Sequence, residues 1–200
     1  TTANSLIRLL YVARGLRGFG DGFAIIILPA YMTALGYDAV AVGIVATVGS
    51  IDWTTLGEFL DSLVRRGISL NVASFVGATS VRVYVLGEDD RDPTPAELAR
   101  MQDLVRQAMR EGALGVGSSL IYAPAFFAET PELIALAQAA AESGGGYVSH
   151  VRNESYRLEE AIDELVEITR AFGGHGEAYH LKAAGEANWG NMARAIAKIE

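Results

Sequence analysis

The pattern of hydrophobic and polar positions changes near residue 51. Before that point, stretches 23–35 and 39–51 contain almost no polar side chains. A run of about thirteen apolar residues forms a helix of about 20 Å, which is shorter than the roughly 30 Å hydrocarbon core of a bilayer. Extending the first stretch backwards gives nearly a full span but includes Asp21, and an ionisable group inside a span is costly. We therefore expect a transmembrane-like helical segment in residues 1–50; a signal peptide and a helical hairpin of a soluble core are the alternatives.

From residue 51 onward, strand-like and helix-like stretches alternate. Helices are predicted where apolar residues recur every three or four positions, and strands where short apolar runs are bounded by glycine or polar loops. Thr94, which precedes Pro95, is predicted to cap the second helix. The expected helices cover 54–66, 93–111, 130–142, 157–172 and 191–199, and the expected strands cover 70–76, 81–86, 113–121, 147–149 and 177–179.

The spacing of these elements predicts the fold class. Strand–helix repeats about thirty residues apart argue for a parallel sheet with right-handed crossovers. The repeats between residues 70 and 200 therefore predict an α/β fold, a partial (β/α)8 barrel of about four βα units. An open doubly wound sheet is the alternative. That fold calls for a glycine-rich phosphate turn, and Gly115-x-Gly117 lacks the third glycine and a following helix start.

Composition and charge narrow the function classes. Half of the 200 residues are hydrophobic, which is sufficient for one ordinary globular core. The net charge is −8; three arginines against two aspartates give residues 1–50 a charge of +1, so −9 falls on residues 51–200. We therefore expect no nucleic-acid partner. The chain contains no cysteine, which excludes disulfides, thiolate metal ligands and a cysteine nucleophile.

Two histidines carry the candidate chemistry. His150 and His180 each stand at the carboxyl end of a predicted strand, one βα unit apart. In a parallel barrel these strand ends meet at the mouth of the active site, so the two imidazoles are expected to converge. Imidazole nitrogens suit a divalent ion such as zinc. The alternative is that both histidines are hydrogen-bonded residues of the core.

Neighbouring polar residues extend this candidate site. Lys182 emerges from the same strand end as His180 and could hold a substrate carboxylate, or it is a solvated loop lysine. Arg152 and Glu154 follow His150 and are candidates for partners that orient the imidazoles, or they form a loop ion pair. His175 lies in a glycine-rich turn at the opposite end of the strands and is expected to be exposed. An acidic face of the helix 157–172 is expected to face water; it comprises Glu159, Glu160, Asp163, Glu164 and Glu167.

The N-terminal segment resembles the opening of a transporter. The resemblance is carried by ARGLRGFGDGFAIIILPAYMTALGYDAVAVGIVATVG, and it is to the major facilitator superfamily. Transporters of this type need about twelve spans, so transport by residues 1–50 alone is not expected. We accordingly expect two regions, a transporter-like fragment over 1–50 and the predicted half barrel over 51–200.

The remaining three quarters of the chain resembles a family of hydrolases. The segments YVSHVRNE (147–154), AYHLKAAG (178–185) and GSSLIYAP (117–124) are similar to those of N-acyl-D-amino-acid deacylases of the amidohydrolase superfamily. The resemblance implies zinc-dependent hydrolysis of the amide of an N-acyl-D-amino acid, by a zinc-bound hydroxide and an aspartate that carries the proton. It also implies that His150 and His180 are zinc ligands, that Lys182 binds the α-carboxylate of the substrate, and that Tyr122 lines the pocket.

The chain also departs from the pattern of that family. The implied His-x-His strand would precede residue 51, the implied metal-binding cysteine is absent, and the implied catalytic aspartate would follow residue 200. Gly77-Ala-Thr79 stands where many members have Gly-His-Gly. We therefore expect no catalytic residue in this chain and little or no deacylase activity from it alone. The alternatives are a membrane-anchored, non-catalytic fragment that binds a metal or a carboxylate, and a chimeric product without function.

Partners and location follow from the same reasoning. The expected ligand is a small N-acyl-D-amino acid, and self-association is expected through the open sheet edges of a half barrel. Residues 51–200 are expected to be cytoplasmic. Membrane contact, and a membrane location, are expected if residues 1–50 are part of the product.

Overall fold

The computed structural model describes residues 53–199, and the residues from Thr55 onward form one compact unit. The transporter-like, membrane-type segment predicted for residues 1–50 lies outside the described residues. Among the helices of 53–199, none combines the length and the apolar character needed to cross a membrane.

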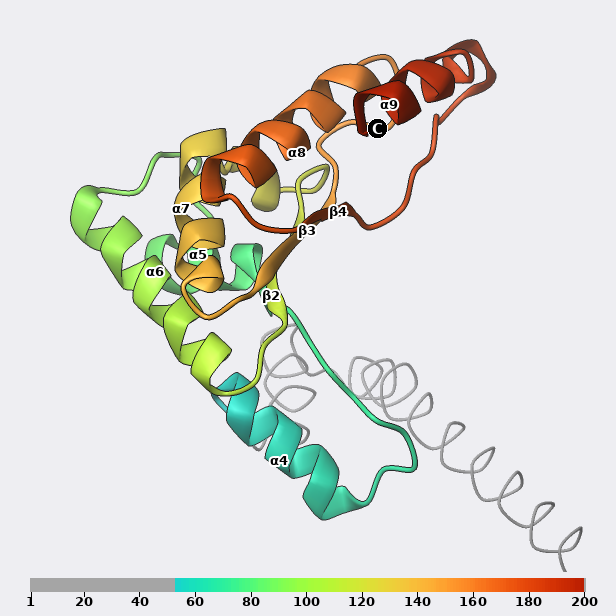
Figure 1. Cartoon of the computed structure of the whole chain (residues 1–200). Helices are drawn as coiled ribbons and strands as arrows, with labels where there is room; N and C mark the ends of the chain where they lie inside the picture. Colours follow the sequence, from blue (N-terminus) through green and yellow to red (C-terminus); the bar gives the residue numbers. More distant parts are fainter. Residues whose placement is uncertain (1–52, 200) are drawn as a thin grey trace, which may run out of the picture. The chain divides into compact units, whose positions relative to one another are not determined.

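A four-stranded parallel sheet organises this unit (Figure 1). Its strands are β1 (Val76–Gly77), β2 (Gly115–Ser119), β3 (Gly146–His150) and β4 (Gly176–Ala178), and they lie side by side in chain order. A helix or helices separate each pair of successive strands, which is why the strands run parallel. The predicted α/β class with a parallel sheet is confirmed.

The helices begin and end where local signals indicate. α6 (Pro95–Arg110) starts at Thr94, whose hydroxyl accepts from the Glu97 N–H while the Glu97 carboxylate accepts from the Thr94 N–H. The same reciprocal cap, built by Thr55, opens α4 (Leu56–Arg66). The remaining helices are α5 (Ala78–Leu86), α7 (Thr130–Ala141), α8 (Leu158–Phe172) and α9 (Asn191–Ile199), with short 3-10 turns η2 (Ala125–Phe127) and η3 (Glu186–Asn188). The predicted helices 54–66, 93–111, 130–142, 157–172 and 191–199 are confirmed within a few residues.

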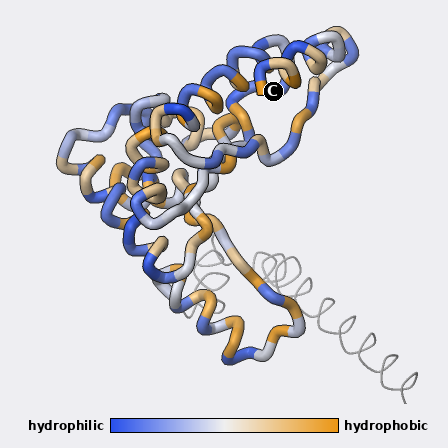
Figure 2. The backbone as a smooth tube through the Cα atoms, viewed as in Figure 1, coloured by the Kyte–Doolittle hydropathy of each residue, from blue (hydrophilic) through white to orange (hydrophobic). Residues whose placement is uncertain are grey.

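The hydrophobic core lies between the sheet and its covering helices. α7 packs against both α6 and α8 and contacts β2 and β3. Apolar positions recur along α6 and α8 with hydrophilic ones between them (Figure 2), as expected for helices with one buried face, whereas α7 is apolar along most of its length. The largest fully buried apolar side chains include Met101, Leu133, Leu136, Tyr147, Leu158, Ile162 and Ile168. This core fixes β3 and β4, whose ends carry the candidate site.

One predicted strand is wrong: residues 81–86 belong to helix α5. The alternating valines at 81, 83 and 85 suggested a strand. In the structure, Ala78, Val81, Arg82 and Leu86 are buried, a spacing of three to four residues that places them on one helical face. Tertiary packing of that face, including the buried arginine, overrides the β preference of valine.

A second predicted strand is largely wrong. Of the expected strand 70–76, only the last residue joins the sheet, as the start of β1. Leu70 and Val72 are 61% and 45% exposed, although the strand was expected to be buried. Before β1, Ser74 accepts one backbone hydrogen bond from Leu114, at 2.9 Å. Among the described residues this segment is extended chain leading into the sheet.

The predicted acidic face of α8 does not simply face water. Glu159 and Asp163 form ion pairs with Arg194 and Lys198 of α9, each at 2.7 Å. Glu164 is bound by Arg152. The expectation is confirmed for the exposed Glu160 and Glu167, but α9 packs along this face.

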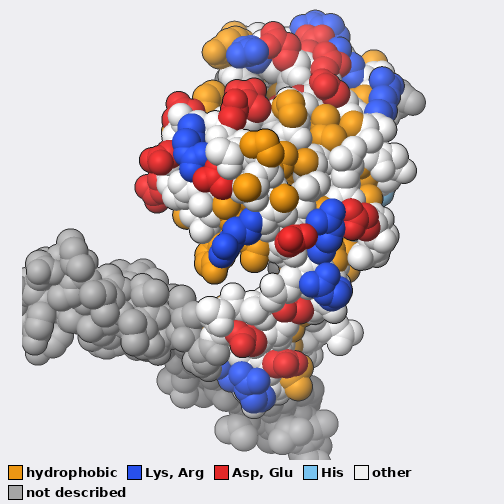
Figure 3. Space-filling model, turned by 90° about the vertical axis from the view of Figure 1, so that its left-hand side faces the viewer, with side chains coloured by type: hydrophobic (Ala, Val, Ile, Leu, Met, Phe, Trp, Pro, Cys, Tyr) orange, Lys and Arg blue, Asp and Glu red, His pale blue; other side chains and the backbone are white. Residues whose placement is uncertain are grey.

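Figure 3 shows acidic, basic and apolar side chains interspersed on one face of the unit.

Candidate metal centre

The two strand-end histidines lie together. His150 is the last residue of β3, and His180 follows the end of β4 by two residues. Because the strands are parallel neighbours, both side chains are delivered to the same edge of the sheet. Their ring centroids are 4.5 Å apart and the rings are nearly perpendicular, at 87°. His150 is 9% exposed, so the pair lies at the boundary of the core.

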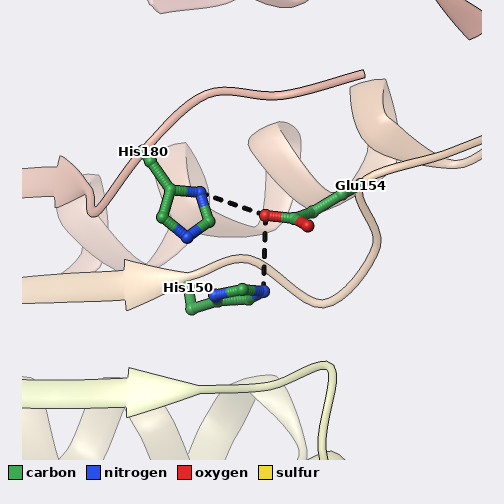
Figure 4. A group of neighbouring side chains, drawn as sticks. All are labelled: His150, Glu154 and His180. Carbon is green, nitrogen blue, oxygen red and sulfur yellow. Dashed lines mark ion pairs between the residues drawn. The ribbon is translucent and has the colours of Figure 1, made fainter. Parts of the chain in front are cut away.

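Glu154 lies between the two imidazoles (Figure 4). Its Oε1 is 3.3 Å from Nε2 of His150 and 3.1 Å from Nδ1 of His180. Its other oxygen, Oε2, is 2.8 Å from Nζ of Lys182. The backbone N–H of Ala184 donates to the Glu154 carbonyl, which ties the segment after β4 to the loop after β3. Four of the residues singled out in the sequence therefore form one cluster.

Three facing atoms of this cluster have no hydrogen-bond partner among the described residues. They are Nε2 of His150, Oε1 of Glu154 and Nδ1 of His180, and all three are buried. Buried polar atoms are normally paired, because an unpaired one costs roughly 1–3 kcal/mol. A cation bound between them would satisfy all three atoms, and the three ligand atoms lie within 4.8 Å of one another. The donor set, two imidazoles and a carboxylate, fits zinc.

The environment of His150 favours its ligand-competent form. Burial, which disfavours the charged ring, lowers the pKa of His150, and the nearby His180 and Lys182 act in the same direction. The Glu154 carboxylate opposes them without reversing the shift. A neutral imidazole keeps a free lone pair on one nitrogen, which is the form that binds a metal.

Two tyrosines border the histidine pair. Tyr122, in the loop after β2, has its ring centroid 5.4 Å from that of His150. Tyr179 has its ring centroid 5.3 Å from that of His180. Both are well exposed, so their faces are available to a bound molecule. The sequence analysis predicts a role for Tyr122 but not for Tyr179. The position of Tyr179 directly before His180 is the feature that could have indicated it.

Arg152 points away from the imidazoles. Its guanidinium makes two hydrogen bonds to the Glu164 carboxylate and donates to the carbonyls of Phe126 and Ala128, each at 2.7 Å. Burial opposes the charge, but the Glu164 carboxylate holds the pKa of Arg152 above its usual value. Arg152 thus fastens turn η2, close to Tyr122, to the loop that carries Glu154.

His175 lies apart from this cluster. It precedes β4, at the opposite end of the strand from His180, and its side chain is 82% exposed. Its nearest ionic group is Glu177, with Nε2 3.9 Å from Oε2. The structure therefore places His175 where a solvent-exposed turn residue was expected.

Replacing Arg152 by methionine is expected to loosen turn η2. Two carbonyls lose a charged donor, and hydrogen bonds to charged groups contribute roughly 1.5–3 kcal/mol each. Amide hydrogen exchange over residues 122–128 should accelerate by about tenfold or more, with α6 unaffected. The exposed Arg170→Met serves as the matched control. Equal exchange in both variants would show that Arg152 does not hold the turn.

The chain is similar in sequence to known deacylases. No protein-family model matches the chain. Among curated proteins, the D-aminoacylase of Alcaligenes xylosoxydans xylosoxydans is 31% identical over 152 residues, which cover 76% of this chain and 31% of that protein. The N-acyl-D-glutamate deacylase of the same organism is 34% identical over 145 residues, covering 72% of this chain and 30% of that protein.

Solved structures give the same result. The N-acyl-D-glutamate deacylase of Bordetella bronchiseptica, complexed with zinc and a phosphonate inhibitor, has a TM-score of 0.68 and 33% identity, covering 72% of this chain and 31% of that chain. A D-aminoacylase structure also has a TM-score of 0.68, at 28% identity. The chain is homologous to the N-acyl-D-amino-acid deacylases. These homologues are amidohydrolases that act on amide bonds, and the chain spans about 30% of the length of the curated relatives it matches.

Proposed function

We propose that this deacylase homologue supplies part of the active site of a zinc-dependent hydrolase, which cleaves the amide of an N-acyl-D-amino acid to a carboxylate and a free D-amino acid. The observation that carries the proposal is the convergence of His150, His180 and Lys182 at one edge of the sheet. The zinc-bound structure of the related Bordetella deacylase supports the choice of metal. The four-stranded sheet is then part of a (β/α)8 barrel, whose active site lies at the carboxyl ends of the strands.

The residues of this chain have distinct tasks in the proposal. His150 and His180 hold the zinc ion, which when bound lowers the pKa of a water molecule and polarises the substrate carbonyl. Lys182 binds the α-carboxylate; its side chain is 52% exposed, so the ammonium can reach a substrate while Glu154 fixes its position. Tyr122 lines the pocket beside His150, where its exposed ring can contact a bound substrate.

The absent groups limit what this chain does by itself. The chain contains no cysteine, and Gly77-Ala-Thr79 supplies no histidine at the end of β1. None of the described residues close to the histidine pair is an aspartate that could carry a proton. We therefore expect zinc binding with little or no hydrolysis from this chain alone.

Zinc binding by the full chain is the direct test. Equilibrium dialysis followed by elemental analysis should find about one zinc ion per chain, and His150→Ala or His180→Ala should remove it. His175→Ala is the matched control, because His175 is an exposed histidine at the other end of the strand. Hydrolysis of N-acetyl-D-amino acids and of their L-enantiomers is measured on the same samples.

The outcomes separate the competing functions. D-selective hydrolysis would establish the deacylase activity outright. Zinc retained with little or no hydrolysis is the result expected of this chain alone, and it would argue against a chimeric product without function. Absence of zinc from the unmodified chain, or equal zinc in the His150 and His175 variants, would contradict the proposed metal centre.

A further inference from the structure

We propose that Glu154 is a third ligand of the metal, and that its two oxygens couple the metal to Lys182. The inference rests on the proposed function, and it goes further by giving Glu154 a direct bond to the ion in place of a role confined to orienting the imidazoles. The carboxylate is well placed for this, because its side chain is only 7% exposed and is enclosed by the two histidines and Lys182.

The distances around Oε1 match those between ligands of one ion. In a tetrahedral zinc site with bonds of about 2.0–2.1 Å, neighbouring ligand atoms are separated by about 3.4 Å. Oε1 of Glu154 is 3.3 Å from Nε2 of His150 and 3.1 Å from Nδ1 of His180. One carboxylate oxygen therefore stands beside both nitrogens at the spacing that a shared cation requires.

Hydrogen bonding does not explain this arrangement. An orienting carboxylate accepts the N–H of a histidine whose other nitrogen holds the metal. Here Oε1 makes no hydrogen bond to either ring, and it and both facing nitrogens are buried without hydrogen-bond partners among the described residues. Oε1 is thus turned toward the same point as the two nitrogens, as a ligand would be.

Lys182 contacts the same carboxylate through its other oxygen. Its ammonium pairs with Oε2 at 2.8 Å, which leaves Oε1 free to face the imidazoles. The same contact partly neutralises Glu154, which weakens its attraction for a cation. Removing the lysine charge should therefore increase metal affinity, whereas removing the glutamate charge should decrease it.

Cobalt(II) and zinc titrations of the full chain test these opposite effects. Glu154→Gln keeps the shape of the side chain, and it should lower affinity for both ions by more than the 10–100-fold typical of an orienting partner. The visible absorption of bound cobalt should also change, because the ion loses a ligand. Lys182→Met should bind cobalt more tightly than the unmodified chain. Glu160→Gln, an exposed glutamate of α8, is the matched control.

A second variant guards against misfolding. Glu154→Asp retains the charge but withdraws the carboxylate, so we expect an intermediate affinity together with an unchanged far-ultraviolet circular dichroism spectrum. An unaltered cobalt spectrum in Glu154→Gln, with a loss of 100-fold or less, would overturn the ligand role while leaving the histidine site intact. If the unmodified chain binds neither ion, the inference and the proposed function both fail. Equal or weaker binding by Lys182→Met would overturn the coupling.

Discussion

Arg82→Met is expected to lower the free energy of unfolding by about 3–5 kcal/mol, because it leaves the buried carboxylate of Glu132 without its ion-pair partner. Arg82 is fully buried on α5 and pairs through Nη1 with Glu132 of α7, which is 4% exposed. The same guanidinium donates to the carbonyls of Asp89 and Arg91, at 3.3 and 2.6 Å. Urea unfolding followed by circular dichroism measures the loss.

A surface pair provides the control for this experiment. Arg106 of α6 pairs with Glu142 at 2.8 Å, but both side chains are partly exposed. Arg106→Met should therefore cost no more than about 1 kcal/mol, the usual limit for an exposed ion pair. Similar losses in the two variants would show that burial of the Arg82 pair is not what stabilises the packing of α5 on α7.

The double variant Arg82→Met/Glu132→Leu should recover most of the lost stability. Replacing both members of a buried ion pair by apolar residues of similar volume removes the unpaired charge. A double variant as unstable as the single one would show that the lost hydrogen bonds to residues 89 and 91, and not the stranded charge, dominate.

The stability of the single variant should also depend more strongly on pH than that of the unmodified protein. Burial raises the pKa of Glu132, and Arg82 opposes that shift. Without Arg82 the raised pKa rises further, so the folded protein binds a proton more tightly than the unfolded chain. Stability should then be retained at low pH and lost as the pH rises above the ordinary carboxyl value of 4.5. The deficit of Arg82→Met should accordingly be smaller at acid than at neutral pH.

This pair also shows where sequence reasoning stops. Thr94 and Pro95 predict the start of α6 because a cap and a first-turn proline act within a few residues. Arg82 and Glu132 are 50 positions apart, and their pairing depends on how α5 and α7 pack. The alternating valines at 81, 83 and 85 predict a strand, but the segment is helical, with Arg82 among the residues of its buried face.

The candidate metal centre also has a part that the sequence predicts and a part that depends on tertiary packing. His150 and His180 could be placed together from the sequence, because parallel strands deliver their ends to one edge of a sheet. For Glu154 the sequence predicts a partner that orients the imidazoles or a member of a loop ion pair, because it follows His150 by four residues. That its carboxylate turns between the two rings depends on the loop after β3 and on Lys182, which arrives from the next βα unit. Contacts that two separate loops create leave no periodic signal in the chain.

Gly115→Ala is expected to cost about 3 kcal/mol or more and to weaken metal binding at the same time. Gly115 opens β2 with φ of 149°, a conformation that residues with a side chain rarely adopt. A Cβ at this position would lie 2.0 Å from the carbonyl oxygen of Gly146, its partner in β3. Since the contact is with backbone, β2 and β3 must move apart, and β3 carries His150 at its other end.

Gly144→Ala isolates the steric part of this effect. Gly144 also has a positive φ, 78°, but a Cβ there would meet nothing within 4 Å. It should therefore lose only the conformational cost, about 1–2 kcal/mol, and bind zinc like the unmodified chain. Urea unfolding without zinc and a zinc titration of each folded variant measure the two effects separately. Equal losses of zinc affinity in both glycine variants would show that close β2–β3 contact does not set the position of His150. A loss of zinc affinity confined to Gly115→Ala would show that the sheet itself positions the metal ligand.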